Sequence, residues 1–215
     1  MITEILSGTI AGVCAAFVIQ GIRAVKLGGL KKVRVFEPRG GQLNTEFYDY
    51  FMQQIRNAKE EIVVTGEGFG YKGIDGPAIA DAYHSSMLTA LRNNVDITRI
   101  QSARRLHPKW AEKLKECVRE HPNKFHLYML DSKEYQDIAS VCVIDADSRN
   151  NVVEMMLSAE NDLEDSPVRL ASTGMFLHGR RDLAKALKEN TLAIKKFSIA
   201  KKCNTEADIE KFLEN

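Results

Sequence analysis

The chain has 215 residues, of which 44% are hydrophobic, and its 30 basic and 29 acidic side chains give a formal net charge of +1. This composition is typical of one or two globular domains, and 14 glycines, five prolines and four cysteines exclude collagen-like, disulfide-stapled and wholly disordered chains. The charge is unevenly distributed, because residues 1–40 carry six basic and two acidic side chains whereas residues 41–215 carry 24 and 27.

The first 30 residues contain a long uncharged run. From Ile5 to Ile22 the chain has 18 residues without a charged side chain, which is the usual lower limit for a membrane-spanning helix. Glu4 precedes the run and Arg23 follows it, whereas a cleaved secretory signal peptide would carry basic residues before the run. We therefore expect one uncleaved transmembrane anchor over residues 1–25.

A basic juxtamembrane linker is expected after the anchor, over residues 26–32. By the positive-inside rule this linker predicts a single-pass protein of the cell membrane whose C-terminal domain is cytoplasmic. Gly8, Gly12 and Ala16 form a stripe of small residues. Such glycines disfavour the alternative of a buried helix in a soluble domain, and in a bilayer they allow two helices to approach closely, so we expect a homo-oligomer, most simply a homodimer.

From residue 33 onward, strand and helix patterns alternate. Short β-branched runs predict strands, and apolar residues spaced by three and four predict helices. The first elements are expected as strand 33–36, helix 45–58, strand 61–65, helix 77–92, strand 96–100, helix 108–120 and strand 125–129. This order predicts an α/β fold with a mainly parallel mixed sheet flanked by helices.

The second half of the domain follows a different pattern. The apolar runs 140–144 and 152–157 are separated by a polar turn, which predicts a hairpin. The remaining elements are expected as a strand at 168–170 continued by 174–177, a helix at 181–196, and a short helix at 206–213 behind the capping pair Thr205 and Asp208. We expect one α/β domain over residues 33–197 and a helical tail over residues 198–215.

The order of these elements resembles the phospholipase D-like superfamily over residues 45–197. The helix-to-strand step LTALRNNVDITRI at residues 88–100 is similar to the one in that family. The hairpin VCVID…VVEMMLS, at residues 141–145 and 152–158, lies where the family carries its HxKxxxxD motif and the GSxN that follows. The resemblance implies a phospholipase D-like fold.

The motif residues themselves are largely replaced. Counting back from Asp145, Ser140 takes the place of the motif lysine and Ile138 that of the histidine, and of the GSxN motif only Ser158 is in register. In the family the histidine is the nucleophile that forms a phospho-histidine, and the lysine stabilises the charge of the phosphate. Isoleucine cannot attack phosphorus and serine carries no positive charge. The resemblance therefore implies a pseudoenzyme that has the fold without the chemistry.

Two basic clusters at strand ends are candidates for binding phosphate. Arg104 and Arg105 follow a predicted strand and precede a helix, and ligands of open α/β sheets gather at such ends. His178, Arg180 and Arg181 lie at a strand-to-helix junction, where backbone N–H groups attract anions. Each cluster is also compatible with a solvated basic turn.

No metal and no other cofactor is expected. The five histidines form no HxH, HxxxH or HExxH pair and the four cysteines form no CxxC pair, so the sequence has no local zinc signature. Reduced thiols are expected in a cytoplasmic domain.

These features favour a membrane-anchored binding or signalling module. Its partner would be a protein or a phosphate-bearing ligand, which the residues leave open as a lipid headgroup, a nucleotide or a nucleic acid. One alternative is a phosphodiesterase or nuclease with displaced catalytic residues such as His178 or His84, the latter expected on the surface. The other is a structural subunit of a membrane assembly.

Overall fold

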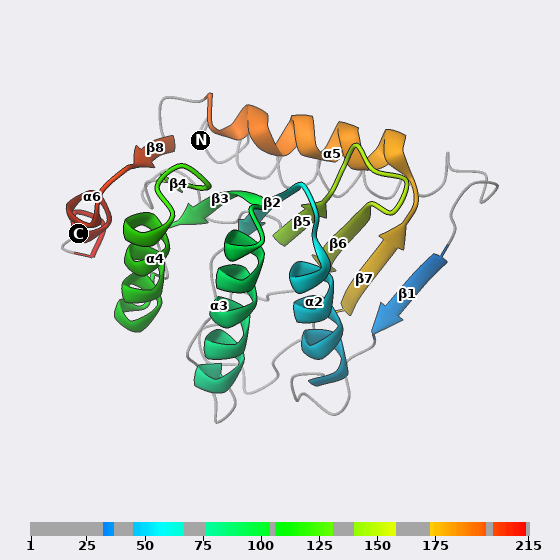
Figure 1. The fold of residues 1–215 in the computed structure, drawn as a ribbon, viewed down its shortest axis with the longest axis horizontal. Helices are drawn as coiled ribbons and strands as arrows, with labels where there is room; N and C mark the ends of the chain where they lie inside the picture. The colour runs from blue at the N-terminus through cyan, green and yellow to red at the C-terminus, as the bar shows by residue number, and fades with distance from the viewer. Residues whose placement is uncertain are drawn as a thin grey trace, which may run out of the picture.

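A mixed sheet lies at the centre of the fold, with helices on both of its faces (Figure 1). The computed structural model describes residues 32–36, 45–66, 76–103, 106–130, 140–157, 173–196 and 200–213. The predicted anchor with Gly8, Gly12 and Ala16, and the predicted strand 168–170, lie outside these residues. Among the described helices, none combines the length and the apolar character that a membrane crossing requires.

Most predicted elements are present close to their expected bounds. The strands are β1 (Lys32–Phe36), β2 (Glu61–Gly66), β3 (Asp96–Ser102), β4 (Phe125–Leu130), β5 (Ser140–Ile144), β6 (Val152–Leu157), β7 (Thr173–His178) and β8 (Ala200–Cys203). The helices are α2 (Thr45–Asn57), α3 (Gly76–Arg92), α4 (Pro108–Glu120), α5 (Arg181–Ile194) and α6 (Glu206–Glu210). The predicted hairpin of β5 and β6 is confirmed with its bounds.

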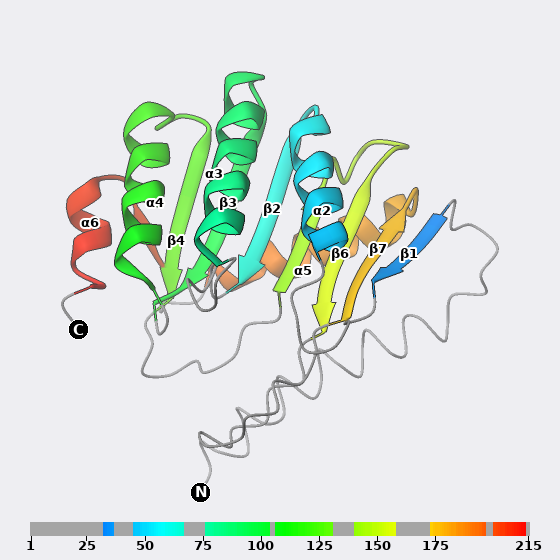
Figure 2. The ribbon, with the colours of Figure 1, turned by 90° about the horizontal axis from the view of Figure 1, so that it is seen from below.

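The eight described strands are ordered β1-β7-β6-β5-β2-β3-β4-β8 (Figure 2). Only the β2–β3 and β3–β4 ladders are parallel, whereas β1–β7, β7–β6, β6–β5, β5–β2 and β4–β8 are antiparallel. The prediction of a mainly parallel sheet is therefore wrong for these strands. The prediction treated β1 as the start of the β-α-β series, but the hairpin and β7 lie between β1 and β2, so β1 forms an edge of the sheet.

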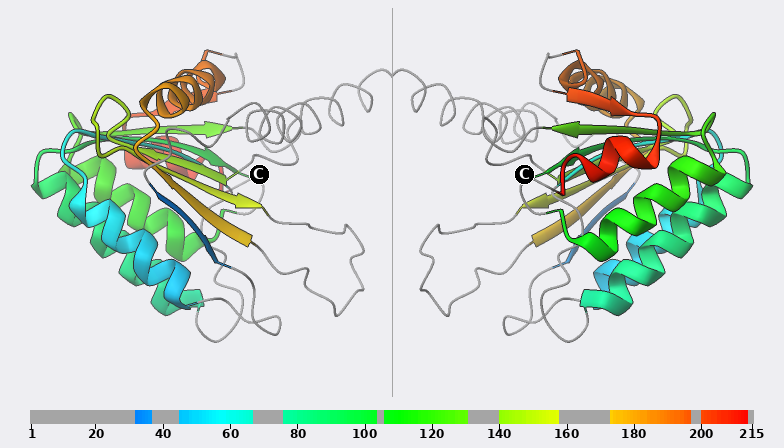
Figure 3. Two further views of the ribbon diagram at one scale, coloured as in Figure 1. Left: turned by 90° about the vertical axis from the view of Figure 1, so that its right-hand side faces the viewer. Right: turned by 90° about the vertical axis from the view of Figure 1, so that its left-hand side faces the viewer.

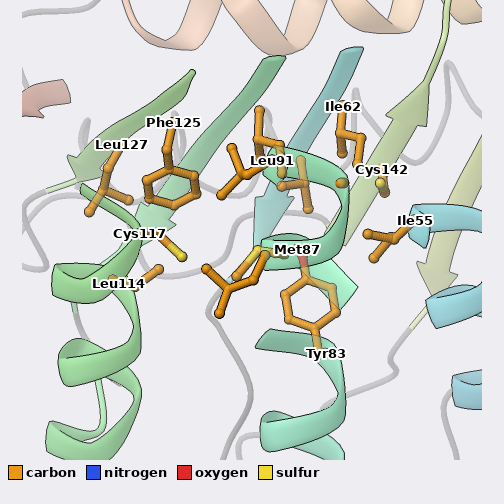
Figure 4. Close-up of a cluster of buried hydrophobic side chains, with 14 of the residues drawn as sticks. Ile55, Ile62, Tyr83, Met87, Leu91, Leu114, Cys117, Phe125, Leu127 and Cys142 are labelled. Atoms are coloured by element: carbon orange, nitrogen blue, oxygen red, sulfur yellow. The ribbon is translucent and has the colours of Figure 1, made fainter. Parts of the chain in front are cut away.

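The helices divide into two layers. α2, α3 and α4 cover one face of the sheet, and α5 covers the other (Figure 3). The main core lies under the three helices, where Figure 4 shows side chains of α2, α3 and α4 pointing toward the strands. Fully burying a large aliphatic or aromatic side chain contributes about 1.5–3 kcal/mol. Under α5 there is a smaller buried cluster, made of Val143, Ala146, Val153, Met155, Leu177 and Ala184.

The C-terminal residues differ from the predicted helical tail. Ala200–Cys203 forms β8 and pairs antiparallel with β4 at the edge of the sheet opposite to β1. A strand of four residues with Lys201 and Lys202 at its centre has no apolar pattern, which explains why the sequence did not predict it. The capping box of α6 is confirmed, because Thr205 accepts a hydrogen bond from the backbone N–H of Asp208 and the Asp208 carboxylate accepts one in return.

Candidate functional site

The carboxyl ends of the parallel strands lie at one edge of the sheet, where ligands of open α/β folds bind. β2 ends there at Gly66 and β3 at Ser102, and the antiparallel strand β5 begins there at Ser140. Thr65 lies opposite Val141 in the β2–β5 ladder, and its hydroxyl accepts a hydrogen bond of 3.3 Å from the backbone N–H of Val141. We call this side of the sheet the carboxyl edge.

Ser140 is the residue of the altered motif that the structure places at the carboxyl edge. It is the first residue of β5, it is half-buried, and it occupies the position of the motif lysine. A serine hydroxyl can exchange a hydrogen bond with a phosphate oxygen, but it cannot offset the negative charge of the phosphate. Ile138 and Ser158, the motif positions on either side of the hairpin, lie outside the described residues.

The retained motif aspartate has a structural role. Asp145 follows β5 at the edge opposite to Ser140, is buried, and has a φ of 50°. Its carboxylate accepts hydrogen bonds from the backbone N–H groups of Lys59, Glu60 and Glu61, at 2.9, 2.8 and 3.1 Å. The side chain therefore holds the turn between α2 and β2 against the hairpin, far from the carboxyl edge.

The predicted basic cluster at the start of α5 is engaged with carboxylates. Arg180 donates two hydrogen bonds to Asp182, at 2.9 and 2.7 Å, and this bidentate contact lowers the pKa of Asp182 to about 2. Arg181 lies 3.7 Å from a carboxylate oxygen of Asp147. Both guanidinium groups are therefore paired with carboxylates. Phosphate binding by Arg180 and Arg181 remains a prediction.

The two strands that precede the predicted basic clusters end at opposite edges of the sheet. His178 ends β7 at the edge that also contains Asp145, and its Nε2 is hydrogen-bonded to the Tyr50 hydroxyl at 2.9 Å. Arg104 and Arg105 lie outside the described residues, and β3 before them ends at the carboxyl edge. The structure thus separates the end of β7 from the end of β3 by the length of the strands.

Comparison with known proteins rests on the fold. Neither a protein-family model nor a curated protein matches the sequence. Among solved structures, the chain is similar to Nuc from Salmonella typhimurium, a phospholipase D family member, with 12% identity and a TM-score of 0.55 over 81% of this chain and 99% of Nuc. The chain has a phospholipase D-like fold.

Two further structures match this phospholipase D-like domain. Phosphatidylserine synthase of Haemophilus influenzae has 12% identity and a TM-score of 0.54 over 85% of this chain and 44% of the synthase. TrmBL2, an archaeal chromatin protein with a novel mode of DNA binding, has 16% identity and a TM-score of 0.55 over 93% of this chain and 65% of TrmBL2. This chain therefore spans less than two thirds of either protein, and the likeness concerns the fold alone.

The other candidate histidine of the phospholipase D-like domain lies between two helices. His84 of α3 is buried against α4, which corrects the expectation of a surface position. Its Nε2 lies 3.5 Å from a carboxylate oxygen of Glu116 and makes no hydrogen bond, and burial lowers the pKa of the imidazole. Among the described residues, no group of three or more His, Cys, Asp or Glu side chains is arranged to hold a metal ion.

A buried polar network under α3 and α4 was missed by the sequence analysis. Arg99 of β3 donates hydrogen bonds to Gln101 Oε1 from Nε at 3.0 Å and from Nη2 at 2.7 Å, and to the Tyr83 hydroxyl at 3.0 Å. The guanidinium also lies over the Trp110 ring, 5.2 Å from its centroid. The missed signal is the placement of Arg99 and Gln101 on the same side of β3 as Ile97, which faces the core.

A buried acid lies in the same layer of the core. Glu154 of β6 is 2% exposed, and its Oε1 has no hydrogen-bond partner. Because water is excluded, the pKa of this carboxyl is raised to about 8, so the side chain is protonated at neutral pH. The signal in the sequence was one acidic residue inside the apolar run VVEMML.

Proposed function

We propose that the chain is a membrane-anchored phospholipase D-like domain that binds a phosphate-bearing ligand or a partner protein without cleaving phosphodiesters. In this proposal residues 1–25 span the cell membrane once, the domain is cytoplasmic, and the protein acts in signalling as a homodimer or a larger homo-oligomer. The anchor and the oligomer are supported by the uncharged run and by the stripe of Gly8, Gly12 and Ala16.

The observation that carries the proposal is the position of Ser140. It begins β5 beside the end of β2, where the resembled family has its charge-stabilising lysine, and Ile138 replaces the nucleophile two residues earlier. The motif residue that this sequence retains, Asp145, holds a turn at the opposite edge. A site in which isoleucine and serine replace the motif histidine and lysine can bind an anion by hydrogen bonds, but Ile138 cannot form the phospho-histidine intermediate of the resembled family.

The competing proposal of displaced catalytic histidines has little support from geometry. All five histidines lie within the described residues, and none lies on β5 or β6. His107 lies nearest along the carboxyl edge, after β3, but its Nδ1 accepts a hydrogen bond from the backbone N–H of Lys109 and caps α4. His178 and His84 lie at the opposite edge and between helices. TrmBL2 adds an example of a similar fold in a protein described by its binding to DNA.

The test is hydrolysis of bis(p-nitrophenyl) phosphate by the full chain in a neutral detergent. We expect no turnover above that of detergent alone, and no difference between the wild type, His178→Ala and His107→Ala. The protein would instead be an enzyme if the wild type turned the substrate over and either histidine variant lost this turnover. Circular dichroism would have to show that the variant is folded as the wild type is.

The anchor and the oligomer are tested separately from chemistry. A chain that lacks residues 1–24 should leave the membrane fraction, and the wild type in detergent should have the mass of a dimer or larger assembly. Gly12→Ile should reduce that mass, because a branched side chain keeps the two helices apart. A truncated chain that still sediments with membranes contradicts the anchor.

A further inference from the structure

Basic and aromatic side chains of the edge strand β1 and of its neighbours α2 and β7 form a group that the proposed function does not use. Lys32 lies opposite His178 in the β1–β7 register, and Arg34 lies opposite Phe176. The Arg34 guanidinium lies over the Tyr50 ring, 4.4 Å from its centroid, and the Tyr50 hydroxyl is hydrogen-bonded to Nε2 of His178 at 2.9 Å. We call Lys32, Arg34, Tyr50 and His178 the β1 cluster.

The two cations of the β1 cluster have no acidic partner within the part of the chain that the structure describes. Among the described residues, no Asp or Glu side chain lies within ion-pair distance of Lys32 or Arg34. By contrast, the cations that follow His178 in the sequence, Arg180, Lys185 and Lys188, are all paired with carboxylates. Burial, followed by the charge of Lys32, lowers the pKa of His178, so the ring is neutral at pH 7. The cluster therefore places two positive charges, without a carboxylate partner among the described residues, beside a polar Tyr–His pair, and this arrangement suits an anionic headgroup.

The opposite face of β1 exposes apolar side chains. Val33 is 43% exposed and Val35 52% exposed, and they are the large hydrophobic side chains that stay exposed in the described part of the chain. β1 pairs only with β7, so its outer side is unpaired within the described sheet (Figure 1). Basic residues combined with exposed apolar side chains suit the interfacial region of a bilayer, where the cations meet headgroups and the apolar groups leave water.

The proposed anchor limits how far β1 can lie from a membrane. Six residues lie between the end of the predicted anchor at residue 25 and Lys32, so the chain makes seven steps of about 3.5 Å when fully extended, and β1 begins within about 25 Å of the bilayer interface. Residues 26–32 are themselves basic. We infer that β1 and the β1 cluster dock on the anionic phospholipid headgroups of the bilayer that holds the anchor, an inference that rests on the proposed function.

The docking orients the whole domain. It places the β1 end of the sheet on the membrane and the β8 end away from it, since the two strands lie at opposite ends of the sheet (Figure 2). Docking through β1 does not use the carboxyl edge, which stays assigned to a soluble ligand or a partner protein. Each Lys or Arg held near an anionic leaflet contributes about 1 kcal/mol of attraction, so loss of both cations should lower the ratio of docked to undocked domain roughly thirtyfold.

The test measures amide hydrogen exchange of the full chain in nanodiscs. Nanodiscs of phosphatidylcholine alone are compared with nanodiscs that contain phosphatidylserine, for the wild type and for the variant Lys32→Gln with Arg34→Gln. The matched control is Lys201→Gln with Lys202→Gln, which removes two cations from the other edge strand. We expect slower exchange of β1 in phosphatidylserine nanodiscs for the wild type and the control, and no slowing for the β1 variant.

Each other outcome contradicts the docking. Exchange of β1 that is the same in both lipids, or that is slowed equally in the β1 variant, overturns it. Slowing that depends on protein concentration and not on lipid shows that a second copy pairs with β1 instead. Incorporation into nanodiscs tests the proposed anchor independently of docking. If the chain does not insert, the proposed anchor is wrong. Exchange of β1 is then measured after nanodiscs are added to the free chain, so that docking is still tested.

Discussion

The two halves of the main core bury a charged residue in different ways. On the β3 side, Arg99 keeps three hydrogen bonds to Gln101 and Tyr83 and lies against the Trp110 ring. On the β6 side, Glu154 has an oxygen without a partner, and its pKa is raised to about 8. The two residues share a face of the sheet, because the registers connect Arg99 to Val64 and onward through β5 to Glu154.

The difference follows from the chemistry of the two groups. A guanidinium cannot lose its proton at any pH that a protein survives, so a buried arginine must be given acceptors. A carboxylate that lacks donors takes up a proton instead and is buried as a neutral acid. The stability of the β3 half therefore depends on the polar partners of Arg99, whereas the stability of the β6 half depends on pH.

The largest expected effect is the loss of the acceptor of Arg99. Gln101→Met leaves the buried guanidinium with Tyr83 as its remaining hydrogen-bond partner, and an uncompensated buried charge costs about 3–5 kcal/mol. We expect the free energy of unfolding in urea to fall by about 4 kcal/mol.

The control for that prediction is the double variant Gln101→Met with Arg99→Met. It removes the charge together with its acceptor and should recover at least half of the loss. A double variant that is less stable than Gln101→Met alone would mean that Arg99 contributes mainly through packing against the rings.

The second effect concerns Asp145. Its carboxylate accepts hydrogen bonds from protein donors, just as the Arg99 guanidinium donates hydrogen bonds to protein acceptors. Asp145→Ala removes the hydrogen bonds from the backbone N–H groups of Lys59, Glu60 and Glu61 and leaves those donors without this acceptor. Hydrogen bonds to charged groups contribute about 1.5–3 kcal/mol, so we expect a loss of about 3 kcal/mol in the same measurement. The exposed Asp147→Ala, in the same turn, is the control and should change stability little.

These residues also show how far sequence reasoning reached. The hairpin of β5 and β6 was predicted with its bounds because each strand is an apolar run closed by a polar turn. The pairing of β1 with β7 was not predicted, because the sequence of a five-residue edge strand does not indicate which strand it pairs with. Asp145 was found as a motif position, but its turn-holding role depends on the α2–β2 turn lying beside it, a long-range contact. Arg99 could be recognised as buried only once the helix-covered face of β3 was known.

The third effect tests the pH dependence of the β6 half. The pKa of Glu154 rises from its ordinary value of 4.5 to about 8 on folding. Between these values the unfolded chain is ionised while the folded chain is not, so stability is complete below about pH 4.5 and falls as the pH rises toward 8. The other ionisable groups facing Glu154 are Tyr48, Tyr83 and Cys142, and each stays neutral in this range because burial raises its pKa.

Glu154→Gln should therefore stabilise the domain at pH 8. At pH 8 the shift corresponds to roughly 4 kcal/mol, and the unpartnered amide of glutamine offsets about half of it, so we expect a gain of about 2 kcal/mol at pH 8 and no gain at pH 4. Urea unfolding at the two pH values measures both. An equal change at both pH values would show that the carboxyl is ionised in the folded protein and that another group sets the pH dependence.

The smallest effect separates the two acceptors of Arg99. Tyr83→Phe removes the hydroxyl that accepts one hydrogen bond from Arg99 and leaves both bonds to Gln101. One such bond contributes about 1 kcal/mol net, so urea unfolding should show a loss of about that size, well below the loss in Gln101→Met. The ring remains, and with it the packing of Tyr83 against Phe51 at 5.7 Å between centroids. If Tyr83→Phe instead costs as much as Gln101→Met, the hydroxyl is as important an acceptor as Gln101, and the charge of Arg99 depends on α3 as much as on its own strand.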